Sequence, residues 1–367
     1  MSISPGDLKS IAREAGLDDA GAVPAGSAMT YPMYREWIGR GEQGQMDYLS
    51  RFMEARADTD SILPNAQTLI VVLLSLNRLA SLSDNVTGRI RECAKTFCTD
   101  HSRTSFQEVR NSDADGTGPH TLNQVRSERA GSKQIGLEPS PFPFGLLVPY
   151  SVCLDYHTCV RNGLRKLAAE LKNRFPGELG RESFRGVVDT APILEKEWAA
   201  RAGLGTIGRN SLLIHPKFGS RVFIGILLTT APPEFFESTQ VQVYGDPVPS
   251  DPCVGCTRCA RACPAGAISE NRTLHASRCL NYWLIEYKGG ELPAEIRNKT
   301  CSRVFGCDTC QSACPYNQPL AENKGTVAIP VRLIQEMDEA QFLILFKGTP
   351  VERLGLTGLR RNAGLDC

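Results

Sequence analysis

The sequence predicts an α+β protein made of three consecutive regions. Apolar residues repeat with helical spacing in some segments of residues 1–243 and form strand-like, β-branched runs in others. Nine of the fourteen cysteines lie between residues 253 and 314, and eight of these nine have the spacing of bacterial ferredoxins. The last segment is helical and basic. We therefore expect an α/β domain over 1–243, a ferredoxin-like domain over 244–322 and a short helical tail over 323–367.

The first region should contain both helices and strands. Helices are expected over 7–14, 34–53, 156–175 and 193–202, and strands over 68–74, 186–190, 211–214 and 222–229. Between these elements the composition changes, because only six of the 42 residues in 99–140 are Leu, Ile, Val or Phe. A segment with so little to bury does not offset the entropy lost on ordering, so we expect a flexible insertion over 82–148.

Composition limits the class of protein. The chain has 41 basic and 40 acidic residues among 367, which is unlike a basic nucleic-acid coat. Its longest apolar run, 69–76, is too short to span a bilayer, and the N-terminus has no signal sequence, so we expect a cytoplasmic protein without a membrane partner. Fourteen cysteines in that compartment indicate metal or redox chemistry rather than disulfides.

The cysteines predict two [4Fe–4S] clusters. They form two groups, Cys253-x2-Cys256-x2-Cys259-x3-Cys263-Pro264, and Cys279 with Cys307-x2-Cys310-x3-Cys314-Pro315. In such runs three close thiolates hold one cluster and the fourth cysteine serves the other. We expect Cys253, Cys256, Cys259 and Cys314 on the first cluster, and Cys263, Cys279, Cys307 and Cys310 on the second. Zinc is the alternative, since thiolates bind it too. Cys301 fits no ligand spacing and is expected to be a small buried thiol.

Two clusters about a dozen ångströms apart form an electron wire. The remainder of the chain should therefore hold an electron acceptor. Gly203-x-Gly205-x-x-Gly208 matches a dinucleotide fingerprint in its letters only, because a helical stretch precedes it and a strand-like one follows. We expect these glycines to permit a tight turn or a close approach to another cofactor. Asp155 is well placed as a helix N-cap, and the simplest interpretation of His157 is a surface residue.

Four blocks of the sequence resemble the epoxyqueuosine reductase family. The blocks are Trp37–Gly41 with Met46–Leu49 and Arg56–Ala66; Asp155-Tyr156-His157 with Val188–Thr190 and Gly203–Asn210; Cys253–Pro315; and Phe346–Arg353 with Leu359–Asn362. Together they span nearly the whole chain apart from residues 82–148. In the family a Gly-Arg-Ile stretch like the one at Gly88 leads almost directly to Asp-Tyr-His, whereas here a longer segment intervenes.

The resemblance implies a cobalamin-binding domain fused to the double-cluster domain. The clusters would pass electrons from an external low-potential donor to cobalamin, which reduces epoxyqueuosine to queuosine at the wobble position of a tRNA anticodon. It implies Asp155 as the catalytic proton donor. The cobalamin contacts it implies are Arg56, Asp155, Asp189, Thr190, Gly205, Asn210 and Ser211. To hold a proton at neutral pH, Asp155 should be desolvated. We expect a monomer.

Two other functions remain open at this point. One is an iron–sulfur and corrinoid reductase of a small molecule, like a reductive dehalogenase, and the other is a plain electron-transfer protein. Lys347, Arg353, Arg360 and Arg361 in the tail could contact tRNA phosphates or simply form a solvated face. Tyr282, Trp283 and Tyr287 could stack on a base, although core packing is the simpler role.

Overall fold

The computed structural model describes residues 2–83, 86, 88–90, 92–93, 144–237, 251–269, 272–317 and 325–364. Its helices are α1 Pro5–Glu14, α2 Tyr31–Gly39, α3 Asp47–Ser50, α4 Leu76–Leu82, α6 Tyr156–Arg174, α7 Pro176–Leu179, α8 Glu195–Arg201, α9 Arg258–Ala262, α10 Ala294–Arg297, α11 Thr309–Ser312, α12 Val331–Glu336, α13 Glu339–Phe346 and α14 Gly355–Asn362. Its strands are β1 Asp19–Pro24, β2 Thr68–Ser75, β3 Phe144–Leu147, β4 Phe184–Val187, β5 Thr206–Ile207, β6 Leu213–Ile214, β7 Val222–Thr229, β8 Arg303–Phe305 and β9 Val327–Pro330.

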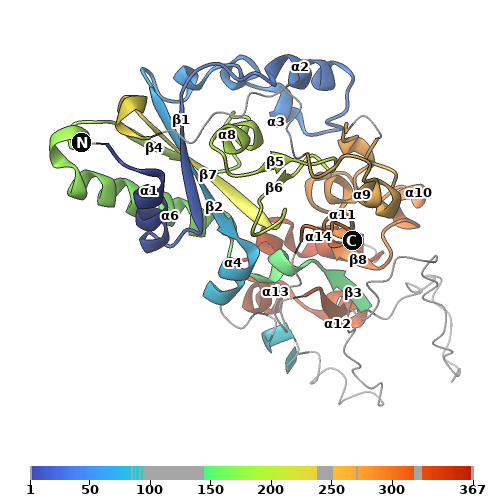
Figure 1. Cartoon of the computed structure of the whole chain (residues 1–367). Coiled ribbons are helices and arrows are strands. Elements are labelled where there is room, and N and C mark those ends of the chain that lie inside the picture. Colours follow the sequence, from blue (N-terminus) through green and yellow to red (C-terminus); the bar gives the residue numbers. More distant parts are fainter. Residues whose placement is uncertain are drawn as a thin grey trace, which may run out of the picture.

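A four-stranded antiparallel sheet, in the order β1-β2-β7-β4, forms the centre of the first region (Figure 1). Every residue of β2 is buried. Successive side chains of a strand point to opposite faces, so Ile70 and Val72 pack with α1 and α6, while Leu69 and Val71 pack with α8. The sheet is therefore covered by helices on both faces, which explains the continuous apolar run of β2.

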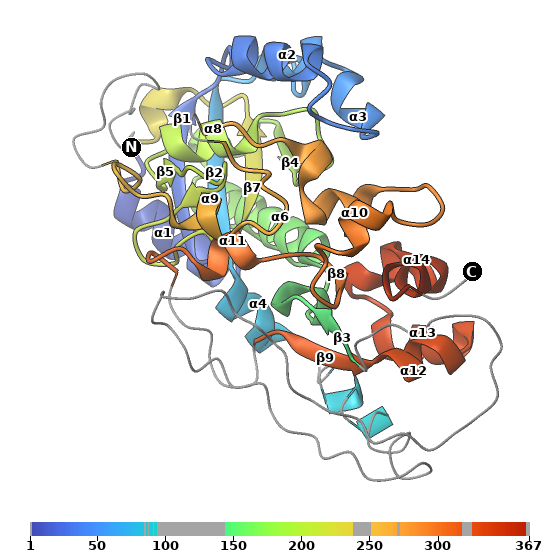
Figure 2. The same ribbon diagram turned by 90° about the vertical axis from the view of Figure 1, so that its right-hand side faces the viewer.

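A second sheet joins all three regions of the sequence. In the order β8-β3-β9, it takes β3 from the first region, β8 from the cysteine-rich region and β9 from the tail (Figure 2). β3 pairs in parallel with β8 and antiparallel with β9. Behind this sheet a hydrophobic core gathers residues of β3, β8 and β9 together with α12, α13 and α14. The tail is thus part of a shared core rather than a separate appendage.

The expected elements mostly form, with shifted ends. The helices expected over 7–14 and 156–175 and the strands over 68–74 and 222–229 correspond to α1, α6, β2 and β7. β1 has no counterpart among the expected strands. None of the helices in the described residues is long and apolar enough to cross a membrane.

The expected insertion is wrong at both of its ends. Val86 and Ile90 are buried in the core behind the second sheet, and 144–147 is strand β3, with Leu147 fully buried. These residues cover apolar surface of the tail and are therefore part of the core. Residues 99–140, on whose composition the expectation was based, lie outside the described residues.

Candidate functional site

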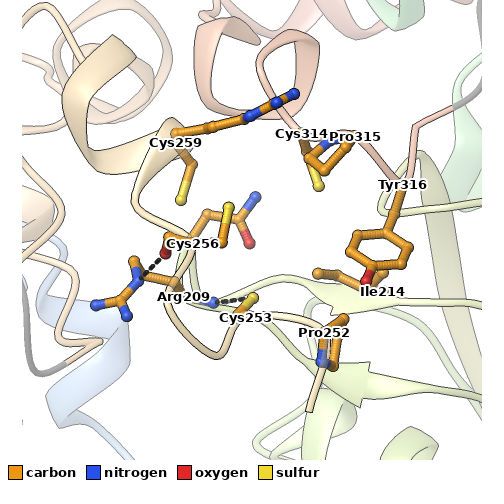
Figure 3. A pocket seen from close by; sticks show the side chains of 11 residues that line it. Arg209, Ile214, Pro252, Cys253, Cys256, Cys259, Cys314, Pro315 and Tyr316 are labelled. Atoms are coloured by element: carbon orange, nitrogen blue, oxygen red, sulfur yellow. Dashed lines mark hydrogen bonds between the residues drawn. The ribbon is translucent and has the colours of Figure 1, made fainter. Parts of the chain in front are cut away.

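Four cysteines from two distant segments surround one pocket. Cys253 and Cys256 lie on the segment leading into α9, Cys259 lies within α9, and Cys314 follows α11. Their sulfur atoms turn toward a shared space (Figure 3). This is the ligand set expected for the first cluster, including the crossed contribution of Cys314.

The second set of cysteines also comes together. The thiols of Cys279 and Cys310 each interact electrostatically with the thiols of Cys263 and Cys307. Burial, followed by repulsion from these neighbours, raises the pKa of both thiols. Iron relieves such repulsion by binding the thiolates, so the chemistry of this set fits a cluster. Cys301 is exposed, which corrects the expectation of a buried thiol.

The β5–β6 hairpin supports the first cysteine set. The backbone N–H of Arg209 donates to Cys253 Sγ at 3.3 Å, and Arg209 Nε donates to the carbonyl of Cys256 at 2.8 Å (Figure 3). On the other set, the N–H of Ala267 donates to Cys263 Sγ at 3.3 Å. Such N–H donors are a usual feature of cluster ligands, because they stabilise the negative charge on sulfur.

A second site forms where α6 begins. The carboxylate of Asp155 caps α6 by accepting from the N–H of His157 at 3.0 Å. The ring of His157 lies between two carboxylates, with Nδ1 at 2.9 Å from Asp155 Oδ1 and Nε2 at 3.0 Å from Asp189 Oδ2. The hydroxyl of Tyr156 donates to the same Asp189 oxygen at 2.8 Å. His157 is only 6% exposed, so it is not the surface residue that the sequence suggested.

The tail completes this second site. Arg353 Nη1 lies 3.3 Å from Asp155 Oδ2 and 2.7 Å from His157 Nδ1. The backbone N–H of Asp155 donates to the carbonyl of Gly348 at 2.8 Å. A loop from the last fifty residues therefore fixes the start of α6.

The pairing sets the charges of the site. Burial opposes ionisation, but hydrogen bonds from His157 and the charge of Arg353 together hold the pKa of Asp155 below its usual value. Burial and the charge of Arg353 oppose a charge on His157, but its hydrogen bonds to Asp155 and Asp189 outweigh them and raise the histidine pKa. The arrangement therefore favours an ionised Asp155, whereas a desolvated, protonated Asp155 was expected.

Helix α8 links this site to the β5–β6 hairpin. Glu195 Oε1 accepts from the N–H of Asp189 at 2.5 Å, and Lys196 Nζ donates to the carbonyl of Ser211 at 2.7 Å. Burial, with the nearby charge of Asp189, raises the pKa of Glu195 to about 8. Asp189 and Ser211 both have positive φ, 52° and 60°, which marks the two turns that α8 ties together.

The other expected cofactor contacts fall into three places. Thr190 is exposed beside Asp189. Gly205 and Asn210 belong to the hairpin, where Asn210 lines the cysteine pocket. Arg56 is 8% exposed, and its guanidinium donates to the carbonyl of Arg51 at 2.7 Å, so it stabilises its own segment.

The sequence did not predict the contacts of His157 and Arg353 at the start of α6. It also did not predict the contacts that Arg360 and Arg361 make with the backbone. Arg360 donates to the carbonyl of Met337 at 2.7 Å and Arg361 to that of Tyr287 at 2.7 Å. These guanidinium groups bind the backbone of neighbouring turns, a structural role that the sequence did not predict, and their contact with phosphate stays a prediction. The resemblance in the Phe346–Arg353 block was the only signal for Arg353, and the spacing Asp-x-His was the signal for His157.

Comparisons with known proteins agree with this geometry. Residues 252–317 match the family described as a 4Fe-4S double cluster binding domain. The epoxyqueuosine reductase of Cyclobacterium marinum is 33% identical over 221 residues, covering 59% of this chain and 67% of the relative. That of Synechococcus sp. is 36% identical over 252 residues, covering 66% of this chain and 74% of the relative.

Two solved structures share the fold. The epoxyqueuosine reductase of Streptococcus thermophilus aligns with a TM-score of 0.69 at 24% identity, covering 97% of this chain and 79% of that one. Another, crystallised with a tRNA-Tyr epoxyqueuosine-modified tRNA stem loop, aligns with a TM-score of 0.69 at 22% identity, covering 98% and 79%. Because relatives that are 33% and 36% identical are matched over two thirds or more of their own length, the chain belongs to the epoxyqueuosine reductase family.

Proposed function

We propose that this protein reduces epoxyqueuosine to queuosine in tRNA, with electrons that enter through its two [4Fe–4S] clusters. The observation that carries the proposal is the presence, in one chain of this family, of a double-cluster domain and an ionic site that can supply protons. Reduction of an epoxide to an alkene takes up two electrons and two protons and releases water. A one-electron wire alone would not account for the site at the start of α6.

The residues at the turns joined by α8 fit a cobalamin. Asp189 and Thr190 are exposed after β4, and Ser211 is partly exposed on the hairpin, so carboxylate and hydroxyl groups are available to the amide-rich edge of a corrin. Asp189, Thr190 and Ser211 would hold the cofactor. When bound, cobalamin supplies a strongly reducing metal centre.

The protons come from the ionic site. When His157 is protonated, it can pass a proton across the 2.9 Å contact to Asp155 Oδ1, which then donates it to the oxygen released from the epoxide. Hydrogen bonds from His157, together with the charge of Arg353, favour the ionised form of Asp155 until that transfer. Glu195, with its pKa raised to about 8, is protonated at neutral pH and is the second source.

The test is the queuosine content of tRNA in a bacterial strain that lacks its own epoxyqueuosine reductase. Expression of the wild-type chain should convert epoxyqueuosine to queuosine, measured by mass spectrometry of tRNA nucleosides. Cys256→Ser should abolish the conversion, whereas Cys301→Ser, at an exposed cysteine outside both ligand sets, should leave it intact. Persistent epoxyqueuosine in cells that contain soluble, iron-loaded wild-type protein would contradict the proposal.

A further inference from the structure

Asn210 occupies an unusual position on the β5–β6 hairpin. Its side chain is 4% exposed and lines the pocket formed by Cys253, Cys256, Cys259 and Cys314. The family resemblance placed it among cobalamin contacts, yet the structure turns it toward the cysteines of the first cluster. The position therefore needs another explanation.

The amide of Asn210 has a donor without a partner. Its Oδ1 accepts from the N–H of Leu212 at 3.3 Å, which fixes the orientation of the amide. Its Nδ2 is buried and has no hydrogen-bond partner among the described residues. Buried donors are almost always satisfied, so an unpaired one in a pocket points to a group that binds there.

The chemistry of the pocket identifies the acceptor. A [4Fe–4S] cluster held by four thiolates is an anion whose sulfur atoms accept N–H hydrogen bonds. The same hairpin already directs one donor at this site, the backbone N–H of Arg209 toward Cys253 Sγ. We propose that Asn210 Nδ2 donates a second hydrogen bond to a sulfur of the first cluster and so raises the reduction potential of that cluster.

The direction follows from charge. Reduction adds one electron to the cluster, and an N–H donor stabilises the more negative state more strongly than the oxidised one. Loss of the donor should therefore lower the potential of the first cluster. The second cluster, held by Cys263, Cys279, Cys307 and Cys310, does not share the pocket of Asn210 and should keep its potential.

Asn210→Leu tests the proposal, because it removes the donor at similar volume. The protein reconstituted with both clusters, without cobalamin, is titrated with reductant and followed by electron paramagnetic resonance; Cys256→Ser identifies the signal of the first cluster. We expect the first cluster to be reduced at a lower potential and the second to be unchanged. Asn210→Gln, which keeps an amide donor, should shift the potential less.

An unchanged potential of the first cluster in fully loaded Asn210→Leu would overturn the proposal. Should Asn210→Leu lose iron, Asn210→Ala decides by the same criterion, because it also lacks the donor and adds no charge beside the cluster. The measurement needs neither tRNA nor epoxyqueuosine. Its failure is thus separate from a failure of the proposed function, which the tRNA assay addresses.

Discussion

At the residue scale, the second site holds a histidine between two carboxylates. His157 has its pKa raised by Asp155 and Asp189, while those two carboxyls have theirs lowered. The contribution of His157 to the stability of the folded protein is fully present at pH values below about 6.5, the pKa of histidine in the unfolded chain. It is lost as the pH rises through the higher pKa of His157 in the folded protein. The contribution of the two aspartates to the stability of the folded protein is present above about pH 3.8. It is lost as the pH falls through their lower pKa values in the folded protein. The pairing is therefore intact from mildly acidic to near-neutral pH.

Asp155→Asn separates capping from proton transfer. Asparagine keeps most of the cap, which is worth roughly 0.5–2 kcal/mol, but it supplies no acidic proton, so turnover should fall by about 10²–10⁴-fold. The variant also removes one of the carboxylates that raise the pKa of His157. In wild-type enzyme the rate should decline as the pH rises through the His157 pKa. In the variant the residual rate should decline at lower pH.

The pH–rate profile under excess reductant, with both clusters loaded, measures both effects. Asp338→Asn is the matched control, because Asp338 also caps a helix, α13, by accepting from the N–H of Gln341 at 2.8 Å, and it is no part of the site. It should leave rate and profile unchanged. Near-normal turnover in Asp155→Asn would assign Asp155 to capping alone.

At the element scale, the β5–β6 hairpin delivers Arg209 and Asn210 to the first cluster. Its shape depends on Gly205, which has a φ of 148° and whose added Cβ would lie 2.3 Å from the carbonyl oxygen of Ile214. Only glycine combines that conformation with so close a backbone approach. The letters of the Gly-x-Gly-x-x-Gly stretch thus serve a hairpin, which the order of the flanking elements had indicated.

Gly205→Ala should displace the hairpin and weaken the first cluster. Overpacking typically costs about 1–3 kcal/mol, and the strained φ adds to it. We expect a lower thermal midpoint and iron lost mainly from the first cluster, by iron analysis and electron paramagnetic resonance. Gly16→Ala is the control, since Gly16 has a φ of 94° with nothing near its added Cβ. The Gly16→Ala variant should have a modestly lower thermal midpoint and keep all its iron. Equal iron loss in both variants would show that displacement of the hairpin is not the cause of the iron loss.

Elements that the sequence predicted are those with a strong local pattern. β2 and β7 are long apolar runs, and α6 has nineteen residues with a regular buried stripe. β1, Asp-Ala-Gly-Ala-Val-Pro, was missed because small residues carry little strand signal. Gly21 is needed there because an added Cβ would lie 2.2 Å from the carbonyl oxygen of Ala202, a contact between distant segments that local patterns do not contain.

The same distinction applies to the site. Cys253, Cys256, Cys259 and Cys314 line one pocket, as their spacing alone led us to expect, and their role as cluster ligands stays a prediction. The ionised state of Asp155 differs from the protonated state that was expected, because hydrogen bonds from the neighbouring His157 lower its pKa, and Arg353, which lies 198 positions later and meets Asp155 only through the fold of the tail, lowers it further. Local sequence patterns identify metal ligands and helix caps, but they do not identify distant residues, such as Arg353, that also shift a pKa.

At the scale of the whole molecule, the tail is part of the fold that carries the site. β9 pairs with β3, and the core behind that sheet buries Leu333, Phe342 and Leu359 of the tail helices. Arg353 and the carbonyl of Gly348 hold Asp155. The three regions read from the sequence are therefore interdependent in three dimensions, and the catalytic and cluster-binding parts are joined through the tail.

Deletion of residues 325–367 should consequently disable more than the tail. It removes β9 and α12–α14, exposes the buried face of β3 and β8, and takes away the partners of Asp155. Exposure of that much apolar surface costs far more than the marginal stability of a domain. We expect little soluble protein and less iron per chain in what remains. A chain that ends at Gly364 keeps every described element and should match wild type in solubility, iron content and thermal midpoint. If the longer deletion yielded soluble protein with both clusters, β9 and the tail helices would be an independent appendage, and the position of Arg353 beside Asp155 would need a different structural cause.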